Sequence, residues 1–91
     1  MRTADYYMIS FESTLEAISA ERYLGARLGV CTMPTLRSVT ASCGISLRVE
    51  AYERAMLKQA LSGDFPVSAQ AYRLYHVTQA GPVPVQPEAL R

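Results

Sequence analysis

A cysteine lies at the end of a polar loop in the stretch PTLRSVTASCGISLRVE, residues 34–50. The loop closes on Ser42-Cys43-Gly44, and an alternating apolar run follows at once. Thiolate is the nucleophilic and sulfur-carrying form of cysteine, so this position could support nucleophilic attack or sulfur transfer. Arg37 in the same loop would favour thiolate, and Gly44 leaves room beside the sulfur for a partner. A lone cysteine at a strand start is more often a small buried hydrophobe, so both interpretations stay open.

The remaining residues with reactive side chains do not suggest a second site. Cys31 lies inside a short apolar run and is interpreted as structural. If the flanking strands pair around the loop, Cys31 faces about residue 46, which leaves it about 10 Å from Cys43. A disulfide needs Cα atoms within roughly 7 Å, so no bridge is expected. His76 is the only histidine and no Cys-x-x-Cys or glycine-rich phosphate loop occurs, so neither a metal nor a cofactor is predicted.

Length and composition indicate one soluble globular domain. The chain has 91 residues with 49% hydrophobic and 19% charged side chains, and its formal net charge is +1. That charge argues against a nucleic-acid surface, which usually carries a clear basic excess. No apolar run is long enough to span a membrane, and the first residues lack the apolar core of a signal peptide. We therefore expect a cytoplasmic protein whose two cysteines are thiols.

Hydrophobic periodicity predicts six elements in the order β-α-β-β-α-β. Strands are expected at residues 5–11, 30–34, 44–50 and 72–77, and helices at 14–28 and 51–62. Ser13 and Glu16 form a capping box for the first helix, and Gly29 is expected as its left-handed C-cap.

The second helix and the tail are less regular. The apolar side of the second helix is predicted to comprise Tyr52, Met56, Leu57, Ala60 and Leu61, with Gly63 as C-cap. In the strand before it, Ile45, Leu47 and Val49 are expected to pack, with Ser46, Arg48 and Glu50 on the polar side. Residues 79–91 are proline-rich and are interpreted as a mobile tail outside a single domain at 1–78.

This element order predicts an α+β, ferredoxin-like split βαβ fold. Right-handed crossovers would place both helices on one face of a four-stranded antiparallel sheet with strand order 4-1-3-2. The 35–44 loop would then lie near the start of the first helix, at Ser13 and Thr14, where unpaired amides and the helix dipole favour thiolate. Some of Tyr6, Met8, Tyr72 and Tyr75 would fall on the face without helices, a surface suited to homodimer formation or ligand binding.

The chain resembles the selenium/sulfur carrier protein-like family over residues 6 to about 77. The resemblance is carried by YYMISFESTLEAISAERYL near the start and by Ser42-Cys43-Gly44 with ISLRV behind it. The family's loop reads close to Pro-x-Pro-Arg-x-x-Ser-x-x-Cys-Gly, which Pro34 and Arg37 match. Leu36 replaces the second proline and Thr40 replaces the serine.

The resemblance implies a sulfur or selenium carrier. Because no general acid or base accompanies the thiol, we do not expect the protein to be an enzyme in its own right. Cys43 would hold a persulfide or selenopersulfide, with Arg37, Ser42 and Gly44 as its loop. Its partners would be a sulfur or selenium donor protein and an acceptor protein. The alternative from the residues is an interaction or dimerisation module that associates through its open sheet face, with Cys43 serving only to pack.

Overall fold

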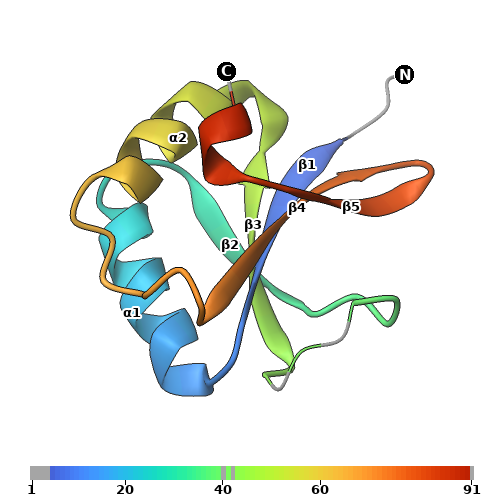
Figure 1. The fold of residues 1–91 in the computed structure, drawn as a ribbon, viewed down its shortest axis with the longest axis horizontal. Helices are drawn as coiled ribbons and strands as arrows, with labels where there is room; N and C mark the ends of the chain where they lie inside the picture. Colours follow the sequence, from blue (N-terminus) through green and yellow to red (C-terminus); the bar gives the residue numbers. More distant parts are fainter. Residues whose placement is uncertain (1–4, 40, 42, 91) are drawn as a thin grey trace.

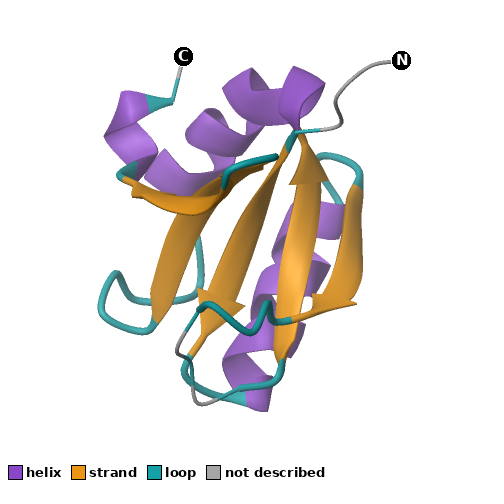
Figure 2. Ribbon diagram, turned by 90° about the vertical axis from the view of Figure 1, so that its right-hand side faces the viewer, coloured by secondary structure: helices purple, strands orange, loops and turns teal. Residues whose placement is uncertain are grey.

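The computed structural model of the chain describes residues 5–39, 41 and 43–90. The elements are β1 Tyr6–Phe11, α1 Thr14–Gly25, β2 Val30–Pro34, β3 Ile45–Glu50, α2 Arg54–Ser62, β4 Tyr72–Thr78 and β5 Gly81–Val85, with short 3-10 turns η1 Ala51–Glu53 and η2 Pro87–Ala89. The strands form one antiparallel sheet in the order β2-β3-β1-β4-β5, and both helices cover the same face of it (Figures 1 and 2). The order predicted for the first four strands is therefore present in this α+β fold.

The sheet has five strands where four were predicted, because part of the segment interpreted as a tail pairs with β4. Prolines at 82 and 84 argued against a strand there. The register explains how the strand forms. Val83 and Val85 lie opposite His76 and Leu74, and the prolines alternate with them. The Ala71 carbonyl accepts from the Glu12 N–H, so the main-chain polar groups of Ala71 face β1. These groups point to alternate sides along a strand, so the N–H and C=O groups of Leu74 and His76 face β5.

The two prolines of β5 therefore turn their missing N–H groups to the outer edge of the sheet. Proline is tolerated in an edge strand in just this orientation, since no ladder hydrogen bond is lost. Gly81, at φ 108°, makes the tight turn from β4. Beyond β5 the η2 turn lies against α2 (Figure 1), and Leu90 is buried in the core.

Two groups of buried side chains lie on opposite faces of the sheet. The helix-side core includes Phe11, Leu24, Leu47, Leu57 and Cys43. The second group lies on the other face and comprises Met8, Val39, Tyr75 and Val77, with Tyr6, Met33 and Leu36 packed against it. The loop after β2 crosses this face (Figure 2) and contributes Leu36 and Val39, so it covers part of the predicted open face. Tyr72 packs on the helix side instead.

Helix α1 begins as predicted and ends differently. The Ser13 side chain accepts a hydrogen bond from the Glu16 amide at 3.3 Å, which confirms the N-cap. The reciprocal half of the capping box is missing, since Glu16 Oε1 is buried without a partner among the described atoms. The helix ends at Gly25, and Gly29 is not left-handed. The Gly29 N–H donates instead to the two oxygens of the Glu53 carboxylate, at 3.1 and 3.2 Å.

The polar and apolar sides of β3 and α2 also need correction. Ser46, expected on a polar side, is fully buried, whereas Ile45 is exposed. In α2 the packed residues are Leu57, Ala60 and Leu61, and Gly63 is the C-cap as predicted. Tyr52 is exposed because it belongs to the η1 turn before the helix, and Met56 lies on the flank of the buried stripe. None of the helices in the described part of the chain is long and apolar enough to cross a membrane.

Candidate functional site

Cys43 lies where the 35–44 loop returns to the sheet beside the start of α1. Its backbone N–H donates to the Phe11 carbonyl at 3.3 Å, which ties it to the end of β1. Its carbonyl accepts from the Thr35 hydroxyl at 3.1 Å, which ties it to the start of the loop. The cysteine is therefore fixed from both sides by its main chain.

The sulfur of Cys43 meets two polar groups. The Ile45 backbone N–H donates to Sγ at 3.4 Å, and Thr14 Oγ1 lies 3.7 Å from Sγ. Thr14 is the first residue of α1, so the sulfur lies at the positive end of the helix dipole, as the predicted topology required. The hydroxyl can accept from a neutral thiol or donate to a thiolate, so it can serve both protonation states.

The structure decides the exposure of the two cysteines, which the sequence left open for Cys43. Cys43 is 5% exposed and belongs to the helix-side core, whereas Cys31 is exposed. Cys31 lies on the edge strand β2 opposite Arg48, five positions beyond Cys43 along β3. That offset corresponds to about 17 Å, so the register strengthens the expectation that the two cysteines do not form an intramolecular disulfide.

The other predicted site residues differ in where the structure places them. Ser13 caps α1 and Thr14 contacts the sulfur. Arg37 is exposed, and within the described residues no hydrogen bond or ion pair joins it to Cys43. Ser42 lies outside the described residues. Gly44 is exposed, and a Cβ added there would meet nothing within 4 Å, so the space next to the cysteine is open.

Sequence reasoning missed Thr35, which organises the base of the loop. Its hydroxyl reaches the Cys43 carbonyl and lies 2.7 Å from Ser46 Oγ, and its N–H donates to the Gly44 carbonyl at 2.9 Å. Ser46 is fully buried, so Thr35 satisfies a hydroxyl that has no access to water. A hydroxyl residue directly after a strand-ending proline was the available signal.

His76 lies in β4 and has a hydrogen-bond partner. Its Nε2 lies 2.8 Å from Asp5 Oδ2 and its ring stacks on Tyr7 with centroids 4.8 Å apart. The hydrogen bond from His76 lowers the pKa of the Asp5 carboxyl below its usual 3.8. The residues that the structure describes contain no group of three or more His, Cys, Asp or Glu placed to hold a metal ion.

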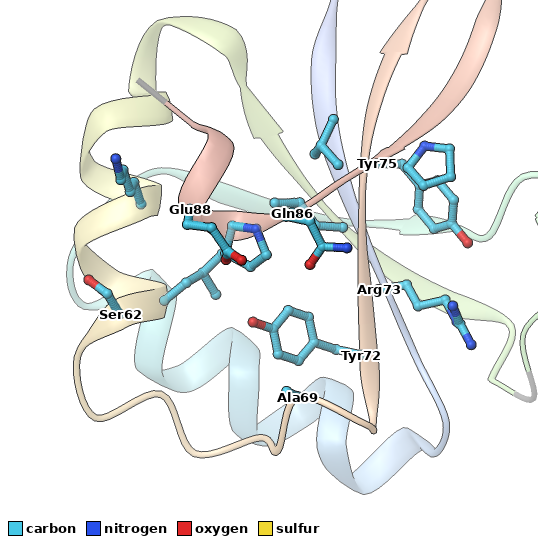
Figure 3. Close-up of a pocket in the computed structure, with 13 residues that line it drawn as sticks. Ser62, Ala69, Tyr72, Arg73, Tyr75, Gln86 and Glu88 are labelled. Atoms are coloured by element: carbon cyan, nitrogen blue, oxygen red, sulfur yellow. The ribbon is translucent and has the colours of Figure 1, made fainter.

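A cavity of about 520 Å³ lies between α2, β4 and η2 (Figure 3), and neither cysteine lines it. Its walls include Leu61, Ser62, Tyr72, Gln86 and Glu88, and Tyr72 and Gln86 point into it. Partial burial, with a smaller contribution from the Glu88 charge, raises the pKa of Tyr72. The pairing of β5 with β4 ends at Val85, opposite Leu74, so within the described residues no β5 residue pairs with Tyr72 at the cavity.

A family model described as "Putative Se/S carrier protein-like" matches residues 6–80. The chain belongs to this family. No curated protein and no solved structure matches the chain. The family match includes the start of α1, the whole 35–44 loop and both cysteines, and it ends one residue before β5. In this chain β5 and the η2 turn follow the matched residues.

Proposed function

We propose that the protein carries sulfur or selenium on Cys43 between a donor and an acceptor protein. The observation that supports this most directly is the position of Sγ between the Ile45 N–H and the Thr14 hydroxyl at the start of α1. Both groups can donate to a negatively charged sulfur, and thiolate is the form that attacks a persulfide. Family membership supports the same assignment.

The transfer is an exchange between sulfur atoms. The Cys43 thiolate attacks the outer sulfur of a persulfide on the donor, and a bond forms between Sγ and that sulfur. The sulfur–sulfur bond of the donor breaks, and the donor leaves as a thiolate. Passing the outer sulfur to an acceptor thiolate repeats the exchange, so the carrier returns to its thiol without net oxidation. The same exchange transfers selenium when the outer atom of the donor is selenium.

The burial of Cys43 requires that a partner uncover the sulfur. Gly44 is the exposed neighbour of the cysteine, with open space where a side chain would be. We therefore place the approach of donor and acceptor on the Gly44 side of the loop. Gly44→Val should leave the fold intact, since no described atom beyond the two chain neighbours lies within 4 Å of an added Cβ, but it should slow loading. Both cysteines are free thiols, which fits the cytoplasmic location expected from the sequence.

Loading with a cysteine desulfurase and cysteine, followed by intact mass under non-reducing conditions, tests the proposal. Wild type and Cys31→Ser should each gain one sulfur atom, and Cys43→Ser should gain none. Cys31→Ser is the matched control because it removes the more exposed thiol. An adduct that persists in Cys43→Ser and disappears in Cys31→Ser would overturn the assignment to Cys43.

The alternative, an interaction module with a structural Cys43, is favoured by one observation. Cys43 is 5% exposed and packs in the helix-side core, as a residue that serves only the fold would. On this view the protein associates through the sheet face that carries Tyr6 and Tyr75, part of which the loop covers. If the protein is such a module, wild type should gain no sulfur in the loading experiment, and Tyr6→Asp should abolish the dimer that sedimentation detects for wild type.

A further inference from the structure

Within the described part of the chain, β2 is an edge strand whose outward backbone groups have no strand beside them. The Thr35 N–H donates to the Gly44 carbonyl, and Thr35 and Gly44 continue the β2–β3 register. Backbone groups alternate sides along a strand, so Cys31 and Met33 face β3 as Thr35 does. The N–H and C=O groups of Val30 and Thr32 therefore face outward, together with the carbonyl of Pro34.

The two edges of the sheet differ in how they could accept another strand. On β5, Pro82 and Pro84 occupy the outward positions, so that edge lacks two donors and is closed to strand addition. On β2, the sequence VCTMP carries no charge, and Val30 and Thr32 keep their donors. Exposed edges are usually protected by charges, prolines or bulges. Strand β2 has one such residue, Pro34 at its last position, which leaves the outward N–H groups of Val30 and Thr32 available for pairing.

We propose that β2 pairs antiparallel with β2 of a second copy of this chain about a two-fold axis at Cys31. Each Val30 N–H then donates to the partner's Thr32 carbonyl, and each Thr32 N–H donates to the partner's Val30 carbonyl. These four hydrogen bonds use every outward donor. Centring the axis on Thr32 instead would leave the Val30 carbonyl facing the partner's Pro34, which has no N–H to give. Pro34 thus selects the register.

Apolar side chains flank the edge on both faces of the sheet. A Cβ at Gly25 would lie 3.9 Å from Val30 Cγ1, so this side of α1 faces β2. Ile18 lies two helical turns earlier on the same side and is 43% exposed. On the other face Cys31 is exposed. The second copy would place its own α1 beside this one and cover Ile18, which extends the contact beyond the backbone.

The register makes a specific geometric prediction for Cys31. In the proposed pairing the two Cys31 residues are directly opposite at a non-hydrogen-bonded position, where Cα atoms lie about 4.5 Å apart. That separation falls within the range of about 4.4–6.8 Å that a disulfide spans. A disulfide between the two Cys31 residues therefore reports the register in which the two β2 strands pair. The pairing would join the two sheets into one and does not depend on whether Cys43 carries sulfur.

Sedimentation velocity over a concentration series, with reductant present, tests the interface. Wild type should show a concentration-dependent dimer. Thr32→Pro should be monomeric over the same range, because it removes an outward N–H and no bond to β3. Thr32→Val keeps that N–H and is the matched control, which should dimerise as wild type does. A wild type that is monomeric at every concentration, or a Thr32→Pro that still dimerises, overturns the proposal.

A second pair of variants keeps the test decisive if Thr32→Pro fails to fold by circular dichroism. Cys31→Asp places like charges opposite each other at the axis, where they destabilise the pair, while facing Arg48 within each copy. It should be monomeric, and Cys31→Ser should remain dimeric. If Cys31→Asp dimerises like Cys31→Ser, the register is wrong.

Oxidation with diamide in a Cys43→Ser background gives an independent readout. Two Cys31 thiols lose two hydrogen atoms to form the disulfide, and diamide is reduced to the hydrazine. The covalent dimer should form faster than in the same background carrying Thr32→Pro or, if that variant is unfolded, Ile18→Asp. Equal rates would show that the link arises from random collision and would contradict the proposed pairing.

Discussion

Thr14 Oγ1 and Cys43 Sγ lie 3.7 Å apart although 29 positions separate the two residues in the sequence. The contact joins the first residue of α1 to the end of the 35–44 loop. It exists because β1 passes directly into α1 while β3 pairs beside β1, which brings the start of β3 to the same end of the sheet. Together with the Ile45 N–H, the Thr14 hydroxyl gives the sulfur polar neighbours within the helix-side core.

The two cysteines should react with thiol reagents at very different rates. Cys31 is exposed, so iodoacetamide should label it rapidly in the native protein. Cys43 is 5% exposed, so its labelling should be at least tenfold slower, because it must await an opening of the loop. Peptide mass mapping against time measures both rates, and the difference should vanish in denaturant. Native Cys43 labelling as fast as Cys31 would contradict the burial.

Thr35→Val should lower the free energy of unfolding by about 1–3 kcal/mol, because it leaves the buried Ser46 hydroxyl without its partner. Urea denaturation measures the change. Ser46→Ala in the Thr35→Val background should recover part of the loss, since it removes the unsatisfied hydroxyl. If Thr35→Val unfolds at the wild-type midpoint, the 2.7 Å contact to Ser46 does not stabilise the loop.

Leu90→Ala should lower the free energy of unfolding by about 2–4 kcal/mol, because the side chain is 4% exposed and packs in the helix-side core. Val83→Ala is the matched control in β5. Its side chain is 50% exposed, so the change should stay within about 0.5 kcal/mol. Equal and small effects of the two variants in urea denaturation would show that the residues after β4 do not belong to the domain.

Stability should fall at acid pH in part through Asp5. The hydrogen bond from His76 lowers the pKa of this carboxyl in the folded protein below its usual 3.8, so the unfolded chain binds the proton more readily. The stability that ionised Asp5 contributes is therefore complete above about pH 3.8 and is lost as the pH falls through the pKa of Asp5 in the folded protein. Urea midpoints from pH 6 down to about 3 should decline less steeply in Asp5→Asn than in wild type. If the urea midpoints of wild type and Asp5→Asn fall equally with pH, the coupling of Asp5 to His76 is contradicted.

The sequence by itself determined the elements whose signals are local. Alternation marked β3 and β4, and Ser13 marked the start of α1, since capping needs only a side chain beside the first amides. Chain handedness then set the order of the first four strands and placed the cysteine loop at the start of α1. That placement could be predicted because it follows from connectivity.

Only the tertiary structure decided β5 and the burial of the cysteines. Pro82 and Pro84 are unfavourable for a strand unless their nitrogens face away from a neighbour, and only the edge of β4 provides that orientation. Cys31 lies inside a short apolar run and Cys43 lies at the end of a polar loop, and neither local pattern shows whether the side chain is exposed. Cys31 is exposed because β2 is an edge strand, and Cys43 is buried because α1 packs over the point where its loop ends.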